Sequence, residues 1–88
     1  MKISKQKEDK IGEQILLFLF TQSPKAIFTA HIARELARDE EFIKKLLIEL
    51  EKKELVIQVK KNNDGVDYSR RLRWRLSNKA YDVYRKLQ

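Results

Sequence analysis

Cysteine is absent from this chain of 88 residues, which also has only one proline and two glycines. Without thiols the chain forms no disulfides and no thiolate metal sites, and a reducing compartment is expected. One histidine and no glycine-rich phosphate loop leave no nucleophile paired with a base. The consecutive acids at positions 39–41 diverge around a helix and do not converge on one cation. These absences predict that the protein is not an enzyme and holds no metal and no cofactor.

Long apolar runs are also missing. The longest, at residues 15–20, is far too short to cross a bilayer. Glu8, Asp9 and Glu13 interrupt the region where a signal peptide would carry its apolar core. We therefore expect a cytoplasmic protein with a single domain, residues 1–88, of which residues 1–7 are flexible.

The net charge of +7 is distributed unevenly along the chain. Residues 29–55 carry six basic and seven acidic side chains, a net charge of −1. Residues 56–75 carry six basic side chains and two acidic ones, a net charge of +4. The positive potential is therefore concentrated in 56–75, and such a segment suits a polyanionic partner, most commonly nucleic acid.

Residues 71–76 (RLRWRL) alternate arginine with an apolar side chain, which is the period of a β-strand. On a strand, Leu72, Trp74 and Leu76 face one side, where we expect Trp74 to be a core residue. The three arginines face the other side. Two interpretations of that face remain open: a solvated surface that keeps the protein soluble, or a surface that binds phosphates.

A helical period of apolar residues predicts a first helix over residues 8–20. This helix is apolar nearly all round, which indicates burial on more than one side. Either a compact core covers it, or it forms a subunit interface. We expect a homodimer in which the last helix completes the interface. The residues expected in this interface are Ile11, Ile15, Leu16, Leu17, Phe20, Tyr81, Tyr84 and Leu87.

Two further helices follow a proline break and a short extended piece at 26–28. Thr29 is expected to cap a helix ending near residue 37, and Asp39 a second helix over about 40–53. Two helices joined by so short a turn form a helix-turn-helix candidate. The β-rich residues 55–59 and 70–76, separated by the turn signal NNDG at 62–65, predict a hairpin. Ser77 or Asn78 then caps a final helix.

From about residue 8 to residue 87 this order resembles a winged helix-turn-helix domain of the bacterial and archaeal regulator type (MarR, PadR and ArsR). The matching segments are 27–36 (IFTAHIAREL), 42–56 (FIKKLLIELEKKELV), which is similar to the family's recognition helix, and 76–80 (LSNKA). The resemblance implies an α+β fold, with a three-helix core, a β-hairpin wing and a C-terminal helix. It also implies a double-stranded DNA-binding protein, a small transcriptional regulator.

Two positions depart from the family pattern. Glu54 stands where the family usually has glycine, so we expect the preceding helix to end without a left-handed glycine cap. The acids at 39–41 begin the helix that would enter the major groove, where they suit the helix dipole but repel phosphates.

The resemblance implies that the helix over 40–53 enters the major groove and that the basic hairpin over 60–75 serves as the wing. Lys44 and Lys45 would reach guanine O6 or N7, and Ile48 would touch a thymine methyl, although a solvated helix face is equally compatible. Four to six phosphate contacts on the wing would make the affinity fall as roughly the fourth to fifth power of salt concentration. The wing residues expected at DNA are Lys60, Lys61, Tyr68, Arg70, Arg71, Arg73 and Arg75.

Two alternative functions remain. A protein-docking winged helix would use the acidic start of helix 40–53 together with Phe42, although a core position is more common for phenylalanine. A sequence-indifferent architectural protein would bind every DNA duplex with nearly the same affinity. His31 lies off the apolar side of its helix, so we expect it to be exposed and incidental to function.

Overall fold

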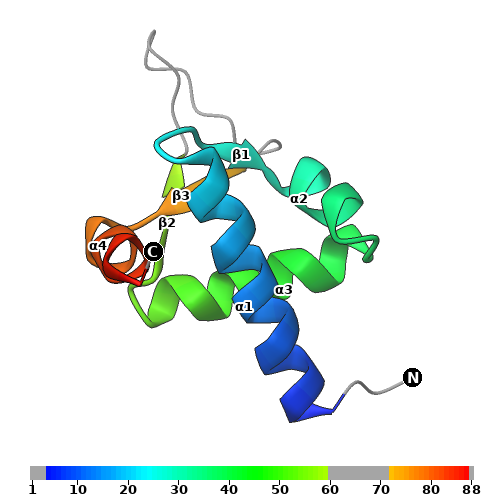
Figure 1. Cartoon of the computed structure of the whole chain (residues 1–88). Helices are drawn as coiled ribbons and strands as arrows, with labels where there is room; N and C mark the ends of the chain where they lie inside the picture. Colours follow the sequence, from blue (N-terminus) through cyan, green and yellow to red (C-terminus); the bar gives the residue numbers. More distant parts are fainter. Residues whose placement is uncertain (1–3, 60–71, 88) are drawn as a thin grey trace, which may run out of the picture.

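The computed structural model describes residues 4–59 and 72–87 of the chain. These residues form helices and strands in the predicted order, and the predicted α+β fold is confirmed (Figure 1). The elements are α1 (Lys5–Gln22), β1 (Ile27–Phe28), α2 (Thr29–Glu35), α3 (Glu40–Lys52), β2 (Val56–Val59), β3 (Arg73–Leu76) and α4 (Asn78–Lys86).

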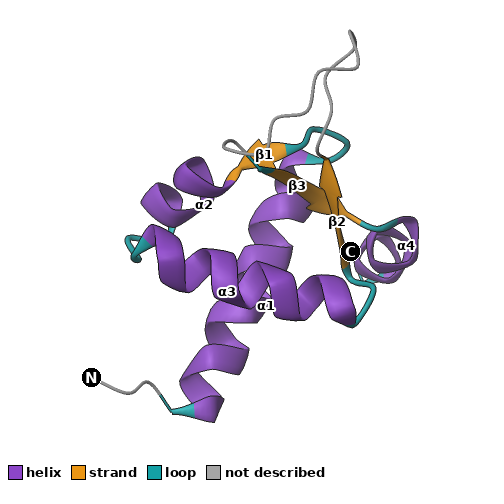
Figure 2. Ribbon diagram, turned by 180° about the vertical axis from the view of Figure 1, so that it is seen from behind, coloured by secondary structure: helices purple, strands orange, loops and turns teal. Residues whose placement is uncertain are grey.

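Helix α1 is longer at both ends than its apolar period indicated. It begins at Lys5, where the Ser4 hydroxyl accepts a hydrogen bond from the Lys7 amide at 3.3 Å. Residues 5–7 therefore belong to the helix, although they were expected in the flexible N-terminus. Helix α1 crosses α3, in front of it in Figure 1 and behind it in Figure 2. Among the described residues no helix is long and apolar enough to span a membrane.

The three strands form one antiparallel sheet in the order β1-β3-β2. Trp74 lies at the centre of this sheet, opposite Ile27 on β1 and Gln58 on β2. The alternation predicted for β3 is confirmed, because Trp74 and Leu76 are buried while Arg73 and Arg75 are only partly covered. Part of the predicted hairpin, including its turn at 62–65, lies outside the described residues.

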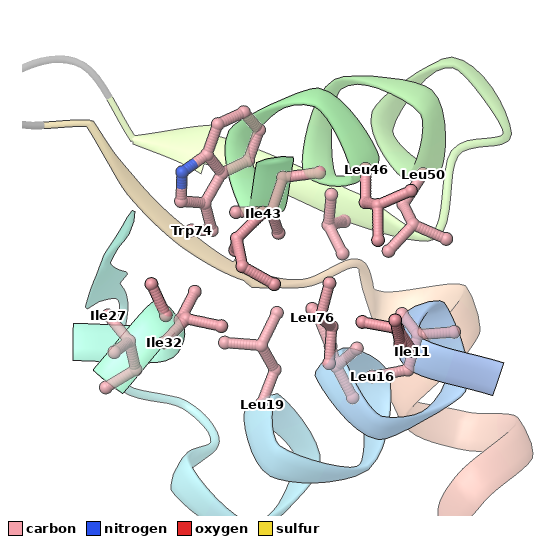
Figure 3. Close-up of a cluster of buried hydrophobic side chains, with 14 of the residues drawn as sticks. Ile11, Leu16, Leu19, Ile27, Ile32, Ile43, Leu46, Leu50, Trp74 and Leu76 are labelled. Atoms are coloured by element: carbon pink, nitrogen blue, oxygen red, sulfur yellow. The ribbon is translucent and has the colours of Figure 1, made fainter. Parts of the chain in front are cut away.

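The hydrophobic core lies between the inner face of the sheet and the helices (Figure 3). Trp74 is completely buried within it, as predicted, and Phe42 packs against it from a half-buried position. The prediction that Ile11, Ile15 and Leu16 form a subunit interface is wrong, because the domain's own core buries all three. Helix α1 is apolar on several sides because it contacts β3, α3 and α4 at once.

Thr29 has a different role from the predicted N-cap. The cap residue of α2 is Phe28, which makes no side-chain capping bond, and Thr29 is the first residue of the helix. The Thr29 hydroxyl accepts a hydrogen bond from the Trp74 indole nitrogen at 2.7 Å and donates to the Leu72 carbonyl at 3.3 Å. The Thr29 amide donates to the same carbonyl at 3.1 Å. These bonds fasten the start of α2 to the residues that enter β3.

The caps of the later helices follow the sequence more closely. The Asp39 carboxylate accepts a hydrogen bond from the Phe42 amide at 3.1 Å, which confirms this predicted N-cap of α3. Ser77 rather than Asn78 caps α4, and its hydroxyl accepts a bond from the Ala80 amide at 3.1 Å.

Helix α3 ends through a left-handed residue even though no glycine is available. Glu54 has a φ of 63°, and the Leu55 amide donates to the Leu50 carbonyl at 3.0 Å. Helix α2 ends in the same way at Ala37, whose φ is 54°. As expected, helix α3 ends without a glycine, and Glu54 itself adopts the left-handed conformation. The bonds across the turn hold a non-glycine residue in a conformation that glycine adopts more readily.

Candidate nucleic-acid interface

Helices α2 and α3 are joined by a short turn and form the helix-turn-helix that the sequence predicts. One side of α3 is buried in the core through Ile43, Leu46, Leu47 and Leu50. Each residue of an α-helix advances about 100° around the axis, so residues that lie three or four positions apart share one side of the helix. The outer stripe of α3, on the side opposite the core, consists of Glu41, Lys45, Ile48 and Lys52. Figure 2 views the molecule from the side on which α3 lies in front of α1.

The three residues predicted to contact bases differ in their surroundings. Lys45 is 59% exposed, and its Nζ lies 3.9 Å from a carboxylate oxygen of Glu8 on α1. Lys44 is half-buried beside the stripe. Ile48 is also half-buried and packs against the core, which limits the surface that it can offer to a thymine methyl. The structure places all three on α3 outside its buried side.

Two of the predicted wing residues lie in the described part of the chain. The Arg73 guanidinium lies over the Phe28 ring, with its carbon 5.8 Å from the ring centre. A guanidinium nitrogen of Arg75 donates to the Leu76 carbonyl at 3.2 Å. Both residues are half-buried. The other predicted wing residues, Lys60, Lys61, Tyr68, Arg70 and Arg71, lie outside the described residues.

The outer face of the sheet carries apolar surface that the sequence analysis did not single out. Phe28 is 41% exposed and Ile57 37% exposed, and both lie on the face of the sheet that carries the arginines. Successive residues of a strand point to opposite faces of the sheet, so the burial of Ile27 and Val56 predicts that Phe28 and Ile57 point outward.

His31 has neighbours on two elements. Its ring meets Phe18 of α1 edge-on, with the ring centres 5.8 Å apart, and its Nε2 lies 3.8 Å from the Glu35 carboxylate. Its side chain is 47% exposed, as expected. Within the described ranges no cluster of three histidine or acidic side chains is arranged to hold a metal ion.

The remaining predicted interface residues lie around the end of α1 and on α4. Leu17 and Tyr81 are exposed, and Leu87 is 77% exposed. Phe20 stacks on Tyr84 with ring centres 5.7 Å apart, and its ring also lies 5.5 Å from that of Tyr81. Burial, and secondarily the charge of Glu13, raises the pKa of the Tyr84 hydroxyl. Val83 on α4 is 53% exposed and was not predicted.

A groove of about 590 Å³ lies between α1 and α3. Its floor includes Gly12, Leu16 and Leu50, and its rim carries both carboxylates and lysines. The mixed charges of this rim do not select a ligand of one sign, so the groove adds no chemistry to the helix-turn-helix surface.

No protein-family model and no curated protein matches the sequence. Among solved structures, Lactococcus lactis ZitR in an apo form matches with a TM-score of 0.71 and 27% identity, over 93% of this chain and 57% of that chain. Staphylococcus aureus MepR, a transcription regulator of the multidrug efflux pump MepA, matches with a TM-score of 0.69 and 23% identity, over 93% and 63%. A MepR variant bound to an oligodeoxyribonucleotide matches with a TM-score of 0.64 and 24% identity, over 94% and 66%.

The structural match confirms the winged-helix fold of the MarR regulator type that the sequence resembles. The chain spans somewhat more than half the length of the structures it matches.

Proposed function

We propose that this chain is a double-stranded DNA-binding module of a small transcriptional regulator, with α3 in the major groove and the basic hairpin over 60–75 as the wing. The observation that carries the proposal is the outer stripe of α3. Glu41, Lys45, Ile48 and Lys52 form a ridge of hydrogen-bonding and apolar groups on a helix held rigidly by the core. Such a ridge has the shape and chemistry that major-groove readout requires.

The wing is assigned mainly from the sequence. Residues 56–75 carry a net charge of +4, which favours the phosphate backbone as their partner. Arg73 and Arg75 are half-buried, so we assign them a smaller share of the phosphate contacts. We assign the phosphate contacts principally to Lys60, Lys61, Arg70 and Arg71, with Tyr68 as a further donor.

A second line of support comes from the matched structures. MepR is described both in a DNA-binding conformation and bound to an oligodeoxyribonucleotide. The matched region of this chain includes its helix-turn-helix, since the match to the DNA-bound structure covers 94% of the chain. By analogy we assign the same type of partner to this chain.

The protein-docking alternative loses one of its two supports. It required Phe42 as an exposed wedge beside the acidic start of α3, but Phe42 packs against the core from a half-buried position. The acids at that helix start have a structural use, because Asp39 caps the helix and Glu40 and Glu41 lie in its first turn, where the dipole favours negative charge.

We further propose a homodimer in the cytoplasm, formed through the exposed apolar residues Leu17, Tyr81 and Leu87 with the neighbouring Phe20 and Tyr84. A symmetric dimer would place two α3 helices on half-sites about 34–36 Å apart. The dimer would cover side chains that the monomer leaves in water.

A gel shift with a pool of random duplexes at low and moderate salt tests the DNA-binding proposal. We expect retardation at low salt and a steep loss of affinity with salt, with a log–log slope of about −0.9 for each phosphate contact. No retardation at low salt would favour the docking function. Equal affinity for every duplex would favour the architectural function.

Variants distinguish the contribution of α3 to DNA binding from that of the wing. Changing Lys44 and Lys45 to alanine should alter the preferred sequence. Changing the four principal wing cations, Lys60, Lys61, Arg70 and Arg71, to alanine should weaken binding to all sequences and flatten the salt slope. A matched control removes two exposed lysines from α4, Lys79 and Lys86, and should leave the preferred sequence unchanged. An unchanged affinity in the quadruple wing variant at every salt concentration contradicts the role of the wing.

A further inference from the structure

We propose that Glu41 determines base specificity by selecting cytosine in the major groove. This inference rests on the proposed DNA-binding function and names the base that one position of α3 reads. Glu41 is the N-terminal member of the outer stripe, followed at i+4 by Lys45 and at i+7 by Ile48. It therefore shares the side of α3 that the proposal places against the bases.

The Glu41 carboxylate is available for such a contact. In the described part of the chain, it makes no ion pair and no side-chain hydrogen bond. Its neighbour in the stripe, Lys45, directs its ammonium to Glu8 on α1 instead. The capping bond at the start of α3 is made by Asp39, so the helix does not require the Glu41 carboxylate as its cap.

The chemistry of the base edges then determines the choice. A carboxylate only accepts hydrogen bonds. Cytosine presents a single donor group, the N4 amine, in the major groove, whereas guanine presents two acceptors and thymine presents O4 and a methyl group. Adenine places the acceptor N7 beside its N6 donor. A carboxylate fixed at this edge is therefore attracted by cytosine and repelled by the acceptors of the other three bases.

A contact with cytosine would also account for an acidic residue on a surface that approaches DNA. Glu41 weakens the attraction to every duplex because it repels phosphates, and only a correctly placed cytosine compensates for that repulsion. The residue thus acts as a filter, which lowers non-specific binding more than specific binding.

The test uses the full chain and a pool of duplexes with randomised positions, followed by titrations of the selected duplex and its single-base variants. We expect cytosine at one position to be preferred over the other bases by about tenfold. In Glu41→Gln the preference at that position should shift to adenine, which a glutamine amide can bind through N6 and N7. The variant should also bind random duplexes more tightly than the parent.

Glu40→Gln is the matched control, because it removes the same charge one residue away, on a different side of the exposed helix start. It should raise the general affinity and keep the cytosine preference. DNA binding without a cytosine preference, or an unchanged preference in Glu41→Gln, overturns the assignment and leaves the proposed function standing. No binding to any duplex at low salt overturns the proposed function and this assignment with it.

Discussion

Replacing Thr29 with valine tests whether the hydrogen bonds around Trp74 stabilise the fold. Valine has nearly the same shape as threonine but lacks the hydroxyl that accepts from the Trp74 indole at 2.7 Å. Thr29 is 6% exposed and Trp74 is fully buried, so water does not readily replace the lost acceptor. The Leu72 carbonyl keeps its bond from the Thr29 amide, which leaves the indole N–H as the group without a partner.

A buried donor without a partner destabilises a protein by about 1–3 kcal/mol, so we expect Thr29→Val to lower the free energy of unfolding by about 2 kcal/mol. For a domain of this size each kcal/mol corresponds to a shift in Tm of about 4–8 °C, which predicts a decrease of about 8–16 °C. Thr29→Ser is the matched control. It keeps the hydroxyl and loses one methyl group, and should therefore destabilise by about 0.8 kcal/mol.

Urea titration followed by circular dichroism gives the free energy of unfolding of both variants. Adding Trp74→Phe to each variant completes a double-mutant cycle, in which the Thr29→Val penalty should shrink by about 1–2 kcal/mol, since phenylalanine has no N–H to satisfy. Equal destabilisation by valine and serine would refute the reasoning. A penalty for valine that does not depend on the residue at position 74 would refute it as well.

Three further predictions concern other parts of the structure. Glu54→Gly should raise the free energy of unfolding by about 0.5–1 kcal/mol in urea titrations, since glycine adopts the left-handed conformation without strain, whereas Glu51→Gly within α3 should lower it by about 1 kcal/mol. The pKa of the Tyr84 hydroxyl is raised in the folded state above its ordinary value of 10.0. The stability that this shift contributes is therefore complete below pH 10.0 and is lost as pH rises through the folded-state pKa. Above pH 10.0 the parent should lose more stability than Tyr84→Phe. Leu17→Glu combined with Leu87→Glu should convert the proposed dimer into a monomer in sedimentation velocity and leave the circular dichroism spectrum of the folded chain unchanged, and a parent that sediments as a monomer contradicts the proposed interface.

The parts of the fold that sequence reasoning found are those with a strong local signal. The alternation in 71–76 identified Trp74 as a core residue, and the side-chain chemistry of Asp39 identified the start of α3. Each of these signals lies within a few residues of the structure that it predicts. Period and capping are local properties, and a single sequence displays them directly.

The errors arise where distant elements determine the outcome. Thr29 has the side chain of an N-cap, but a partner 45 residues away takes its hydroxyl. Ile15 and Leu17 are both apolar residues of α1, yet Ile15 is fully buried while Leu17 is 50% exposed, because the other elements cover one side of the helix more than the other. None of these facts is encoded within a few neighbouring positions.

The candidate site has two parts, the helix-turn-helix and the hairpin, and the two differ in net charge. Residues 29–55, which contain α2 and α3, carry a net charge of −1, so they add no net attraction to a polyphosphate. Residues 56–75 carry a net charge of +4 and supply attraction that is independent of sequence. A recognition helix with little net charge gains affinity only where its side chains match the bases. If the proposed function holds, selectivity comes from α3 and affinity from the wing, and Glu41 strengthens the selectivity because it lowers the general affinity.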